Sequence, residues 1–310
     1  MKNILVVGSI NMDMVMNTPY IPKLGETING LGFMTVCGGK GANQACAIAR
    51  LGLDVSMIGC VGNDVYASTL KENLLSSGVE ISGVHTVEGS SGVAQITVCN
   101  GNNFIILEKG ANGLLTPEII DKEEEKFRNA DIVILQFEIP EQTNIYAAKM
   151  AKKHNAKVLL NPAPMQKIPE ELIRYTDIFV PNRHEAAELL GYELECEADY
   201  IKAIEDIKNM GIEQTVITLG SKGSVFNCAD EIYLQPPVKT NVVDTTAAGD
   251  SFIGGFSSKY TEGCSLFECI TNATKIATIV IGKKGASTSM PSKEEVDKAT
   301  FDIPSVIKLK

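Results

Sequence analysis

Two aspartates, Asp244 and Asp250, lie six residues apart in the stretch VVDTTAAGDSFIGGF, residues 242–256. Only threonine, alanine and glycine separate them, and the apolar run that follows predicts a helix. Small residues at the start of a helix allow consecutive backbone N–H groups to face an anion, and the helix dipole favours the negative charge. Asp250 would stand beside that anion as a base for an alcohol, although the residues alone explain it equally well as an N-cap.

Polar side chains also follow short apolar runs elsewhere in the chain. They lie in the segments GSINMD (8–13), GGKGANQA (38–45), QFEIP (136–140), NPAP (161–164), PNRHEAAELLG (181–191) and TLGSKG (218–223). Ligands of open parallel sheets bind beyond the carboxyl ends of the strands, so this shared placement predicts one polar crevice. Taken singly, the segments have simpler explanations. The glycine pair at 38–39 fits a tight turn, Glu138 fits a solvated loop carboxylate, and Asn182 with Glu185 fits a helix capping pair.

Several known catalytic motifs are absent from the chain. The phosphate-binding pattern GxxxxGK[ST] does not occur, and the first apolar run leads into GSINMD rather than GxGxxG. There is no GxSxG segment, and His85, His154 and His184 stand in no triad setting; His184 fits a helix surface. These absences argue against a P-loop NTPase, a dinucleotide-dependent dehydrogenase and a serine hydrolase. Phosphoryl transfer stays open, because it needs positioned amides, a metal ion and a base near the attacking hydroxyl.

The composition is that of an ordinary globular protein. The 310 residues are 44% hydrophobic and 21% charged, and the net charge of −10 argues against a nucleic-acid partner, which would need a basic face. The eight cysteines form no CxxC pair, and their positions in apolar runs favour a reducing cytosol over a disulfide framework. No apolar stretch reaches the ~20 residues of a membrane span, and no signal segment is recognisable. We therefore expect a cytoplasmic protein without a membrane partner.

Short β-branched runs alternate with helical patterns along the chain. Buried strands are predicted at NILVVG, DVSMIGCVG, DIVILQF, AKVLLNP, DIFVPN and QTVITLG, and a further strand at KTNVV before Asp244. Helices are predicted at NQACAIARLG, ASTLKENLLSSG, EQTNIYAAKMAKKHN, EAAELLG and SFIGGFSSKY. This alternation predicts an α/β fold, a three-layer α/β/α sandwich with a mostly parallel central sheet.

Two segments, residues 12–37 and 89–109, break the alternation because they contain no good helix. The second has NGNN (100–103) between alternating strands, which indicates a hairpin. The two segments fit either a decorated sheet edge or a small β lid over the active site. No repeat or linker is recognisable, so residues 1–310 are predicted to form a single domain with the β segments appended as a lid.

The segments GGKGANQACAIARLG (38–52) and DTTAAGDSFIGGF (244–256) resemble the two signature regions of the ribokinase-type carbohydrate kinases. Relatives in this family include fructokinase and adenosine kinase. The likeness extends over nearly the whole chain in order, through GSINMD, PKLGETI, NPAP, PNRHEAAELLG, ITLGSKG and KKGAS. Within the family, the segments GSINMD, GGKGANQA and NPAP resemble the ribokinases in particular. The resemblance implies ATP-dependent phosphorylation of the 5-hydroxyl of D-ribose to D-ribose 5-phosphate.

The resemblance also implies roles for individual residues. The sugar would bind to Asn11, Asp13, Gly39, Lys40, Asn43 and Glu138. Asp250 would also contact the sugar and act as general base, beside an anion hole formed by Ala247, Ala248 and Gly249. ATP would bind with Mg²⁺ at Asn182, Glu185, Thr218, Gly220, Ser221, Gly223, Gly249 and Thr274. Glu185 would act through water and Mg²⁺, an ion that keeps most of its waters, so no dense carboxylate cage is expected.

A monovalent cation, usually K⁺, activates ribokinases beside the anion hole. The resemblance places this cation at Asp244, Thr246, Val280, Lys283, Gly285 and Ser289. Two positions depart from the family pattern. AAGD stands where many relatives have GAGD, which adds a methyl group but keeps every N–H. Lys283 stands where arginine is common, a change without effect if its carbonyl oxygen is the ligand.

Other functions of the same fold stay open at this point. A nucleoside kinase would need an apolar platform for a base, which four lid residues could supply: Met14, Met16, Phe33 and Met34. A sugar-phosphate kinase would need more basic lid residues than Lys23 and Lys109. A non-catalytic sugar or nucleotide sensor is disfavoured by Asp250 and the small residues before it. An exposed apolar face on a β lid favours pairing with a second copy, as is common in the family, so we expect a homodimer through the lid.

Overall fold

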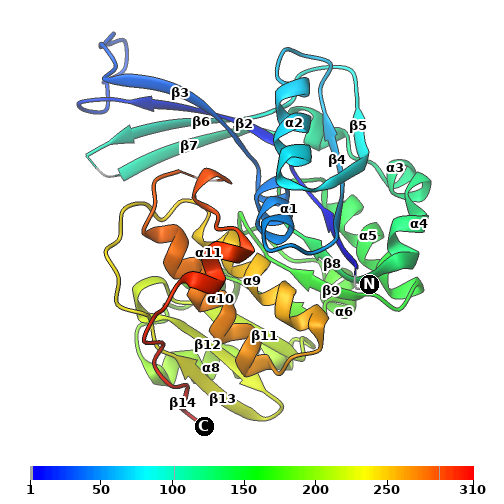
Figure 1. Cartoon of the computed structure of the whole chain (residues 1–310), viewed down its shortest axis with the longest axis vertical. Helices are drawn as coiled ribbons and strands as arrows, with labels where there is room; N and C mark the ends of the chain where they lie inside the picture. Colours follow the sequence, from blue (N-terminus) through cyan, green and yellow to red (C-terminus); the bar gives the residue numbers. More distant parts are fainter. Residues whose placement is uncertain (1–2, 101, 286) are drawn as a thin grey trace.

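The structure, a computed structural model, describes residues 3–100, 102–285 and 287–310. It has three α/β/α layers and a second, smaller sheet (Figure 1). The described strands are β1 (Asn3–Val7), β2 (Asn11–Asn17), β3 (Gly32–Gly38), β4 (Val55–Val61), β5 (Glu80–Thr86), β6 (Gly92–Cys99), β7 (Asn102–Glu108), β8 (Ala130–Leu135), β9 (Lys157–Leu160), β10 (Ile178–Phe179), β11 (Gln214–Thr218), β12 (Ser224–Cys228), β13 (Glu231–Gln235) and β14 (Ile307–Lys308). The described helices are α1 (Lys40–Arg50), α2 (Ala67–Ser77), α3 (Pro117–Lys122), α4 (Glu124–Asn129), α5 (Glu141–Lys153), α6 (Glu170–Tyr175), α7 (Arg183–Leu190), α8 (Glu197–Asn209), α9 (Ala248–Glu262), α10 (Leu266–Ile281) and α11 (Lys293–Lys298), with short 3₁₀ helices η1 (Gly110–Leu114), η2 (Gly220–Lys222) and η3 (Ser287–Ser289).

The central sheet has ten strands in the order β14-β13-β12-β11-β10-β9-β8-β1-β4-β5. Neighbours from β5 to β11 are parallel, whereas β12, β13 and β14 extend one edge in antiparallel orientation. Parallel neighbours need crossover connections, which the helices between these strands supply. The predicted mostly parallel sheet is confirmed, and it contains all the predicted strands from NILVVG to QTVITLG.

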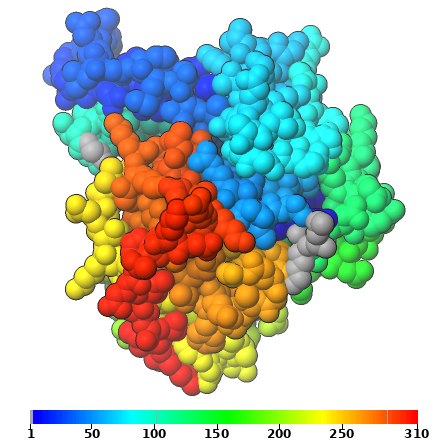
Figure 2. All heavy atoms as spheres, in the orientation of Figure 1, coloured from blue at the N-terminus to red at the C-terminus, as the bar shows by residue number. Residues whose placement is uncertain are grey.

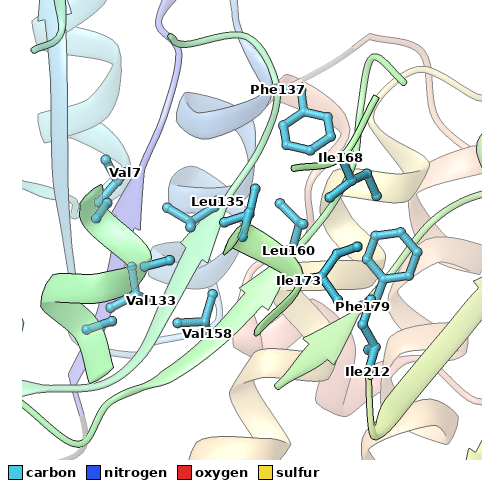
Figure 3. Packing of buried hydrophobic residues seen from close by; sticks show 14 of the residues in the cluster. Val7, Val133, Leu135, Phe137, Val158, Leu160, Ile168, Ile173, Phe179 and Ile212 are labelled. Atoms are coloured by element: carbon cyan, nitrogen blue, oxygen red, sulfur yellow. The ribbon is translucent and has the colours of Figure 1, made fainter. Parts of the chain in front are cut away.

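Apolar side chains cover both faces of the central strands. In β1, Leu5 and Val7 pack with residues of α3 to α8, whereas Ile4 and Val6 pack with residues of α1, α2, α9 and α10. Figure 3 shows Val7 in the first of these layers, near side chains of β8 and β9. Successive side chains of a strand point to opposite faces, so strands apolar on both faces require helices on both sides.

The strands of the two predicted β segments form the second sheet, in the order β3-β2-β6-β7. β2 and β6 are parallel, and the outer strands are antiparallel to their neighbours. This sheet, called the lid below, projects from one end of the molecule (Figures 1 and 2). The hairpin predicted at NGNN falls between β6 and β7, and its Gly101 lies outside the described residues. Only residues 8–10 separate β1 from β2, so the lid begins directly at the central sheet.

The loop before α9 differs from the prediction. KTNVV, residues 239–243, is not a strand, and its Val242 and Val243 are each 60% exposed. The N–H of Val243 donates to the carbonyl oxygen of Ile281 (2.7 Å), so the loop is held to the end of α10 rather than to a sheet edge. The strands and α-helices that the sequence did not predict are β5, β12, β13, β14, α3, α4, α6, α8, α10 and α11.

The eight cysteines are free thiols, four of them buried. Burial raises the pKa of Cys60, and chiefly burial that of Cys269, to about 12, so both stay protonated at neutral pH. These two residues pack as small apolar side chains of the core. Within the described ranges of the chain, no helix is long and apolar enough to cross a membrane.

Candidate active site

Five parallel strands end at the same edge of the central sheet, and a predicted polar segment lies at the end of each. GSINMD follows β1, QFEIP follows β8, NPAP follows β9, PNRHEAAELLG follows β10 and TLGSKG begins at the last residue of β11. The first turns of α1 and α9 meet there, and the first turn of α7 adjoins the end of β11. Polar residues that the sequence places far apart are therefore neighbours in space.

Asp250 is held by amide side chains of a neighbouring helix. It is the third residue of α9 and only 8% exposed. Its Oδ2 accepts a hydrogen bond from Asn43 Nδ2 (3.1 Å), and its Oδ1 accepts one from Gln44 Nε2 (3.0 Å). Ala247 occupies the N-cap position, so the alternative explanation of Asp250 as an N-cap is wrong.

Glu138 joins the start of β2 to the start of α1. Its Oε2 accepts hydrogen bonds from Ser9 Oγ, from Asn11 Nδ2 (3.3 Å) and from the backbone N–H of Lys40 (3.2 Å). Asn11 is also held on its other side, because its Oδ1 accepts from Asn112 Nδ2 (2.6 Å). The simpler explanation of Glu138 as a solvated loop carboxylate is therefore wrong, since the side chain is partly buried and binds three donors.

Two glycines permit the close approach of β2 and α1. Gly39 has a φ of 92°, and a Cβ there would lie 2.8 Å from the backbone N of Asn11. A Cβ on Gly38 would lie 2.2 Å from Asp13 Oδ2. A larger residue at either position would displace one of the two polar residues of β2. The glycines thus serve the site as well as the turn.

The ionisable groups of this cluster shift one another's pKa values. Burial, with repulsion from Glu138 and Asp250, raises the pKa of Asp13 to about 7, and attraction to Lys40 offsets this only in part. Burial alone would lower the pKa of Lys40, but the surrounding carboxylates outweigh burial and raise it. Lys40 consequently stays charged, while Asp13 changes its protonation near neutral pH.

Asn182 and Glu185 form a capping box at the start of α7. Asn182 Oδ1 accepts from the N–H of Glu185 (2.9 Å), and Glu185 Oε2 accepts from the N–H of Asn182 (2.8 Å), so the predicted capping pair is confirmed. Asn182 also pairs with Thr218 at the end of β11. Burial, the largest cause, raises the pKa of Glu185. Asn182 and Glu185 therefore cap α7 and also lie beside the site.

The end of β11 and the turn after it carry four more of the predicted nucleotide residues: Thr218, Gly220, Ser221 and Gly223. Gly220 and Gly223 have φ values of 60° and 91°, which turn the chain back so that the N–H of Leu219 donates to the carbonyl oxygen of Gly223 (2.8 Å). Gly220 and Ser221 are exposed. Thr274, predicted with this set, lies instead within α10, where it is buried and its carbonyl oxygen accepts from the hydroxyl of Thr278 (2.7 Å).

The start of α9 is open except at Ala248, whose N–H donates to the carbonyl oxygen of Thr245 (3.2 Å). Ala247 adopts a left-handed φ of 59°, and within the described residues no side chain caps the first turn. A Cβ placed on Gly249 would meet no atom within 4 Å. The first N–H groups of a helix have no partner inside the helix, so an open start of this kind suits an anion such as phosphate.

Asp244 is held by its own loop. Its Oδ1 accepts from the N–H (2.9 Å) and hydroxyl (2.6 Å) of Thr246, and its Oδ2 accepts from the N–H of Gly285 (3.0 Å). Burial would raise the pKa of Asp244, but these hydrogen bonds outweigh burial and lower it. The structure thus brings three of the six predicted cation residues into direct contact.

The other three predicted cation residues lie outside the loop of Asp244: Val280 in α10, Lys283 just after α10 and Ser289 in η3. The carbonyl oxygen of Val280 accepts from the N–H of Lys283 (3.0 Å), and the Lys283 ammonium pairs with Glu295 (2.6 Å), away from a ligand role. Ser289 is buried in η3. In the part of the chain that the structure describes, no group of three or more His, Cys, Asp or Glu side chains could hold a metal ion. A cation at this loop would therefore depend on carbonyl and hydroxyl oxygens, which are ligands that hard cations accept.

Several buried amide side chains of the site were not predicted as site residues: Gln44, Gln136 and Asn161 near Asp250, and Asn112 beside Asn11. Gln44 donates to Asp250 and to Asn161 Oδ1 (3.2 Å), and Gln136 donates to Gln44 (2.7 Å). Gln136 and Asn161 stand directly after apolar strands, a signal that could have found them. Gln44 offers no such signal, because it falls in a helical pattern among core residues.

Comparison with known proteins gives matches over nearly the full chain. The family model described as pfkB family carbohydrate kinase matches residues 1–293. The chain is 40% identical to a ribokinase of Lactococcus lactis over 297 residues, 96% of each protein. It is 36% identical to a deoxyribokinase of Salmonella typhimurium over 299 residues, 96% of this chain and 98% of that protein. A solved structure of Arabidopsis thaliana ribokinase complexed with ribose and ATP matches with a TM-score of 0.91 and 37% identity, over 96% of this chain and 98% of that one. These matches confirm the predicted fold class.

Proposed function

Because the chain belongs to the pfkB family of carbohydrate kinases, we propose that it transfers the terminal phosphoryl group of ATP to the 5-hydroxyl of D-ribose. The family agrees with the resemblance of the two signature segments in the sequence. The observation that carries the proposal is the position of Asp250, a buried carboxylate at the open start of α9, beside polar side chains of α1.

Asp250 is the general base of the proposed reaction. As the 5-oxygen of the sugar forms its bond to phosphorus, the hydroxyl proton passes to the carboxylate, and the bond between phosphorus and the leaving ADP oxygen breaks. Residues 247–249 supply backbone N–H groups toward the charge on the transferring group. The open space in front of Gly249 supports this role.

The sugar binds among the predicted polar residues of β2, α1 and the end of β8. Glu138 and Asp13 supply acceptors, while Lys40 and Asn43 supply donors. A small polyol needs such a mixed set, because each buried polar group left without a partner costs about 1–3 kcal/mol. The hydrogen bonds that already join Glu138 to Asn11 and to the start of α1 keep this set in place before the sugar arrives.

ATP binds along the turn after β11 and the start of α7. The exposed residues Gly220 and Ser221 border the nucleotide, and its phosphates approach the first turn of α9. Mg²⁺ bound to the phosphates would neutralise part of their charge, with Glu185 holding the ion through water. The burial of Glu185 beside Asn182 agrees with an indirect contact of this kind.

A monovalent cation, K⁺ in the family pattern, binds at the Asp244 loop. Asp244 would keep its negative charge there because its pKa is lowered. Thr246 and the carbonyl oxygens at the end of α10 supply the remaining ligands. Lys283 contributes through its backbone, since its ammonium group pairs with Glu295.

A second candidate substrate is 2-deoxy-D-ribose, because a deoxyribokinase is among the similar proteins. A nucleoside is a weaker candidate. Met14 and Met16 lie on the face of β2 opposite to Asp13, and Phe33, which pairs with Met16, shares that opposite face. Of the four predicted platform residues only Met34 shares the face of Asp13, so the apolar platform for a base is largely missing on the side of the sugar residues.

The lid supports a homodimer. Phe33, Phe104 and Ile106 are more than half exposed, and Met16 and Phe104 line a groove of about 390 Å³. Apolar strands of this kind are stabilised by a second copy. Sedimentation of Phe104→Lys should show monomers, whereas Leu75→Lys on α2, where the side chain is equally exposed, should leave the dimer intact.

We also propose that the protein is cytoplasmic, because its eight cysteines are free thiols. Residues 1–310 are proposed to form one domain with its lid.

The experiment that tests the proposal is an ADP-release screen with D-ribose, 2-deoxy-D-ribose, D-fructose and adenosine, each with and without K⁺. We expect D-ribose with K⁺ to give the highest kcat/KM. Faster turnover of 2-deoxy-D-ribose or adenosine would reassign the substrate within the family. No release above the water blank with any of the four would instead support a non-catalytic sensor.

A further inference from the structure

A chain of buried side-chain amides ends on Asp250. Gln136, directly after β8, donates from Nε2 to Gln44 Oε1 (2.7 Å). Gln44, in α1, donates from Nε2 to Asp250 Oδ1 (3.0 Å) and to Asn161 Oδ1 (3.2 Å). Gln44 and Gln136 are fully buried, and Asn161 is 8% exposed. This amide chain, defined as Gln136, Gln44 and Asn161, thus contacts the carboxylate from inside the protein.

The amide chain fixes which end of the Gln44 side chain faces Asp250. Both hydrogens of its Nε2 are used, and its Oε1 receives a hydrogen bond from Gln136. Turning the amide over would set its oxygen against two acceptor oxygens and its NH₂ group against the NH₂ group of Gln136. Asn161 is oriented in turn, because its Nδ2 donates to the carbonyl oxygen of Val180 (2.9 Å).

The chemistry of the donor also matters. A side-chain amide carries no charge and neither gains nor loses a proton at neutral pH, so Gln44 holds the carboxylate without competing for the proton that a base must accept. The hydrogen bond that its oxygen receives from Gln136 polarises the amide and strengthens its donation to Asp250. An ammonium group in the same place would stabilise the carboxylate by charge and weaken it as a base.

The two oxygens of Asp250 therefore have different surroundings. Oδ1 contacts the buried Gln44, whereas Oδ2 contacts Asn43, one of the residues assigned to the sugar. We propose that Gln44 is the positioning residue of the reaction, holding Oδ1 of Asp250 so that Oδ2 faces the acceptor hydroxyl. This inference rests on the proposed function, because Gln44 acts only through the base.

The main variant is Gln44→Met, which keeps the length of the side chain and removes the amide. We expect kcat with D-ribose to fall about 10- to 100-fold, because a small misplacement of a reacting group is costly. The KM for D-ribose should stay within about threefold, since Gln44 does not touch the sugar. A rise in KM at unchanged kcat would overturn the inference, because it would make Gln44 a binding residue.

Asn227→Leu provides a matched control. Asn227 is a buried amide of β12 that donates to the carbonyl oxygen of Glu213 (2.7 Å) and accepts from the N–H of Thr215 (2.8 Å), at the start of β11 rather than at its end. This variant should lose thermal stability as Gln44→Met does while keeping the native kcat. An equal loss of kcat in both variants would show a general effect of lost buried amides and overturn the inference.

A double-mutant cycle separates this inference from the proposed function. In Asp250→Asn, Gln44→Met should cause no further loss of the residual rate, because the two residues act as a unit. Additive losses would overturn the positioning role. If the native enzyme releases no ADP with D-ribose, the proposed function fails. If Asp250→Asn is as active as the native enzyme, the role of Asp250 as base fails and the positioning role of Gln44 fails with it. If Asp250→Asn is inactive while Gln44→Met is native-like, only the positioning role fails. Should Gln44→Met not fold, Gln136→Met replaces it, with an expected fall in kcat of about threefold to tenfold and the same unchanged KM; native kcat there would count against the inference.

Discussion

Asp250 and Asp244 lie six residues apart, yet the fold holds them in different ways. Asp250 receives side-chain amides of α1, from residues 207 and 206 positions away in the chain. Asp244 receives donors from Thr246, two positions away, and from Gly285 in the loop after α10. The environment of Asp250 exists only after the layers have assembled around the sheet, whereas much of the environment of Asp244 is local. Neutral side-chain amides suit a carboxylate that must gain and lose a proton, and a lowered pKa suits one that keeps its charge.

The largest expected effect comes from removing the carboxylate of Asp250. Asp250→Asn should lower kcat with D-ribose about 1000-fold, because the amide cannot accept the hydroxyl proton. ATP binding, measured by titration calorimetry, should be nearly unchanged. Turnover within tenfold of the native rate would remove Asp250 as the base and, with it, the contrast between the two aspartates.

A smaller effect is expected at the other aspartate. Asp244→Asn should lower kcat about tenfold at a fixed K⁺ concentration, since a lost ligand weakens the cation site. Replacing K⁺ by tetramethylammonium should reduce the native rate to a similar level and leave the variant unaffected. Asp230→Asn, at an exposed aspartate on the surface, serves as the control and should behave as the native enzyme. A native response to K⁺ in Asp244→Asn would show that the cation binds elsewhere.

Asp13 extends the comparison to a third aspartate, one surrounded by charges. Because the pKa of Asp13 is raised to about 7, lowering the pH from 7.5 to 6.5 should reduce the kcat/KM for D-ribose about threefold as the acceptor becomes protonated. The measurement is a pH profile of kcat/KM in mixed buffers of constant ionic strength. A flat profile across this interval would mean that ionised Asp13 is not needed for sugar binding.

The smallest effect concerns stability. The pKa of Asp13 is higher in the folded than in the unfolded chain, so the stability that its protonation contributes is present below pH 4 and is lost as the pH rises through 7. Asp13→Asn carries no charge and should increase the free energy of unfolding at pH 8, with little change near pH 4. Urea denaturation at the two pH values measures this. Destabilisation at pH 8 would contradict the unfavourable burial of the charge.

Much of the fold could be predicted because its strands are buried on both faces. Apart from one polar residue at the first or second position of each, the runs that became β1, β4, β8 and β9 are apolar. The helices between them show regular apolar spacing. The failure at KTNVV has a clear reason. Its β-branched residues suit a strand, but no sheet edge is available to them, and Val243 binds the end of α10 instead. Strand propensity depends on the neighbours that a segment finds.

The residues of the candidate site likewise fall into two groups: those that the sequence could identify and those that it could not. Polar residues such as Asn11, Glu138 and Asn182 could be identified because each follows an apolar strand, and the sheet brings those ends together. Gln44 could not be identified, because its role depends on Asn161 and Gln136, which lie 117 and 92 positions away. Contacts between residues so far apart in the chain produce no periodic pattern in a single sequence. The prediction of a cation at the Asp244 loop rests on resemblance alone, since the proposed ligands are largely backbone oxygens.

β2 carries both proposed binding surfaces, one for the sugar and one for a second copy of the chain. Asp13 lies on one face of this strand, and Met14 and Met16 lie on the other, where the apolar groove of the lid begins. If occupation of one face changes the free energy of occupying the other, thermodynamic linkage requires the two effects to be equal in size. If a second copy on the groove tightens sugar binding by some factor, the sugar tightens the association of the two copies by that same factor. Enzyme concentration then becomes a variable of the saturation curve, and a dilution series at fixed sugar measures the coupling directly.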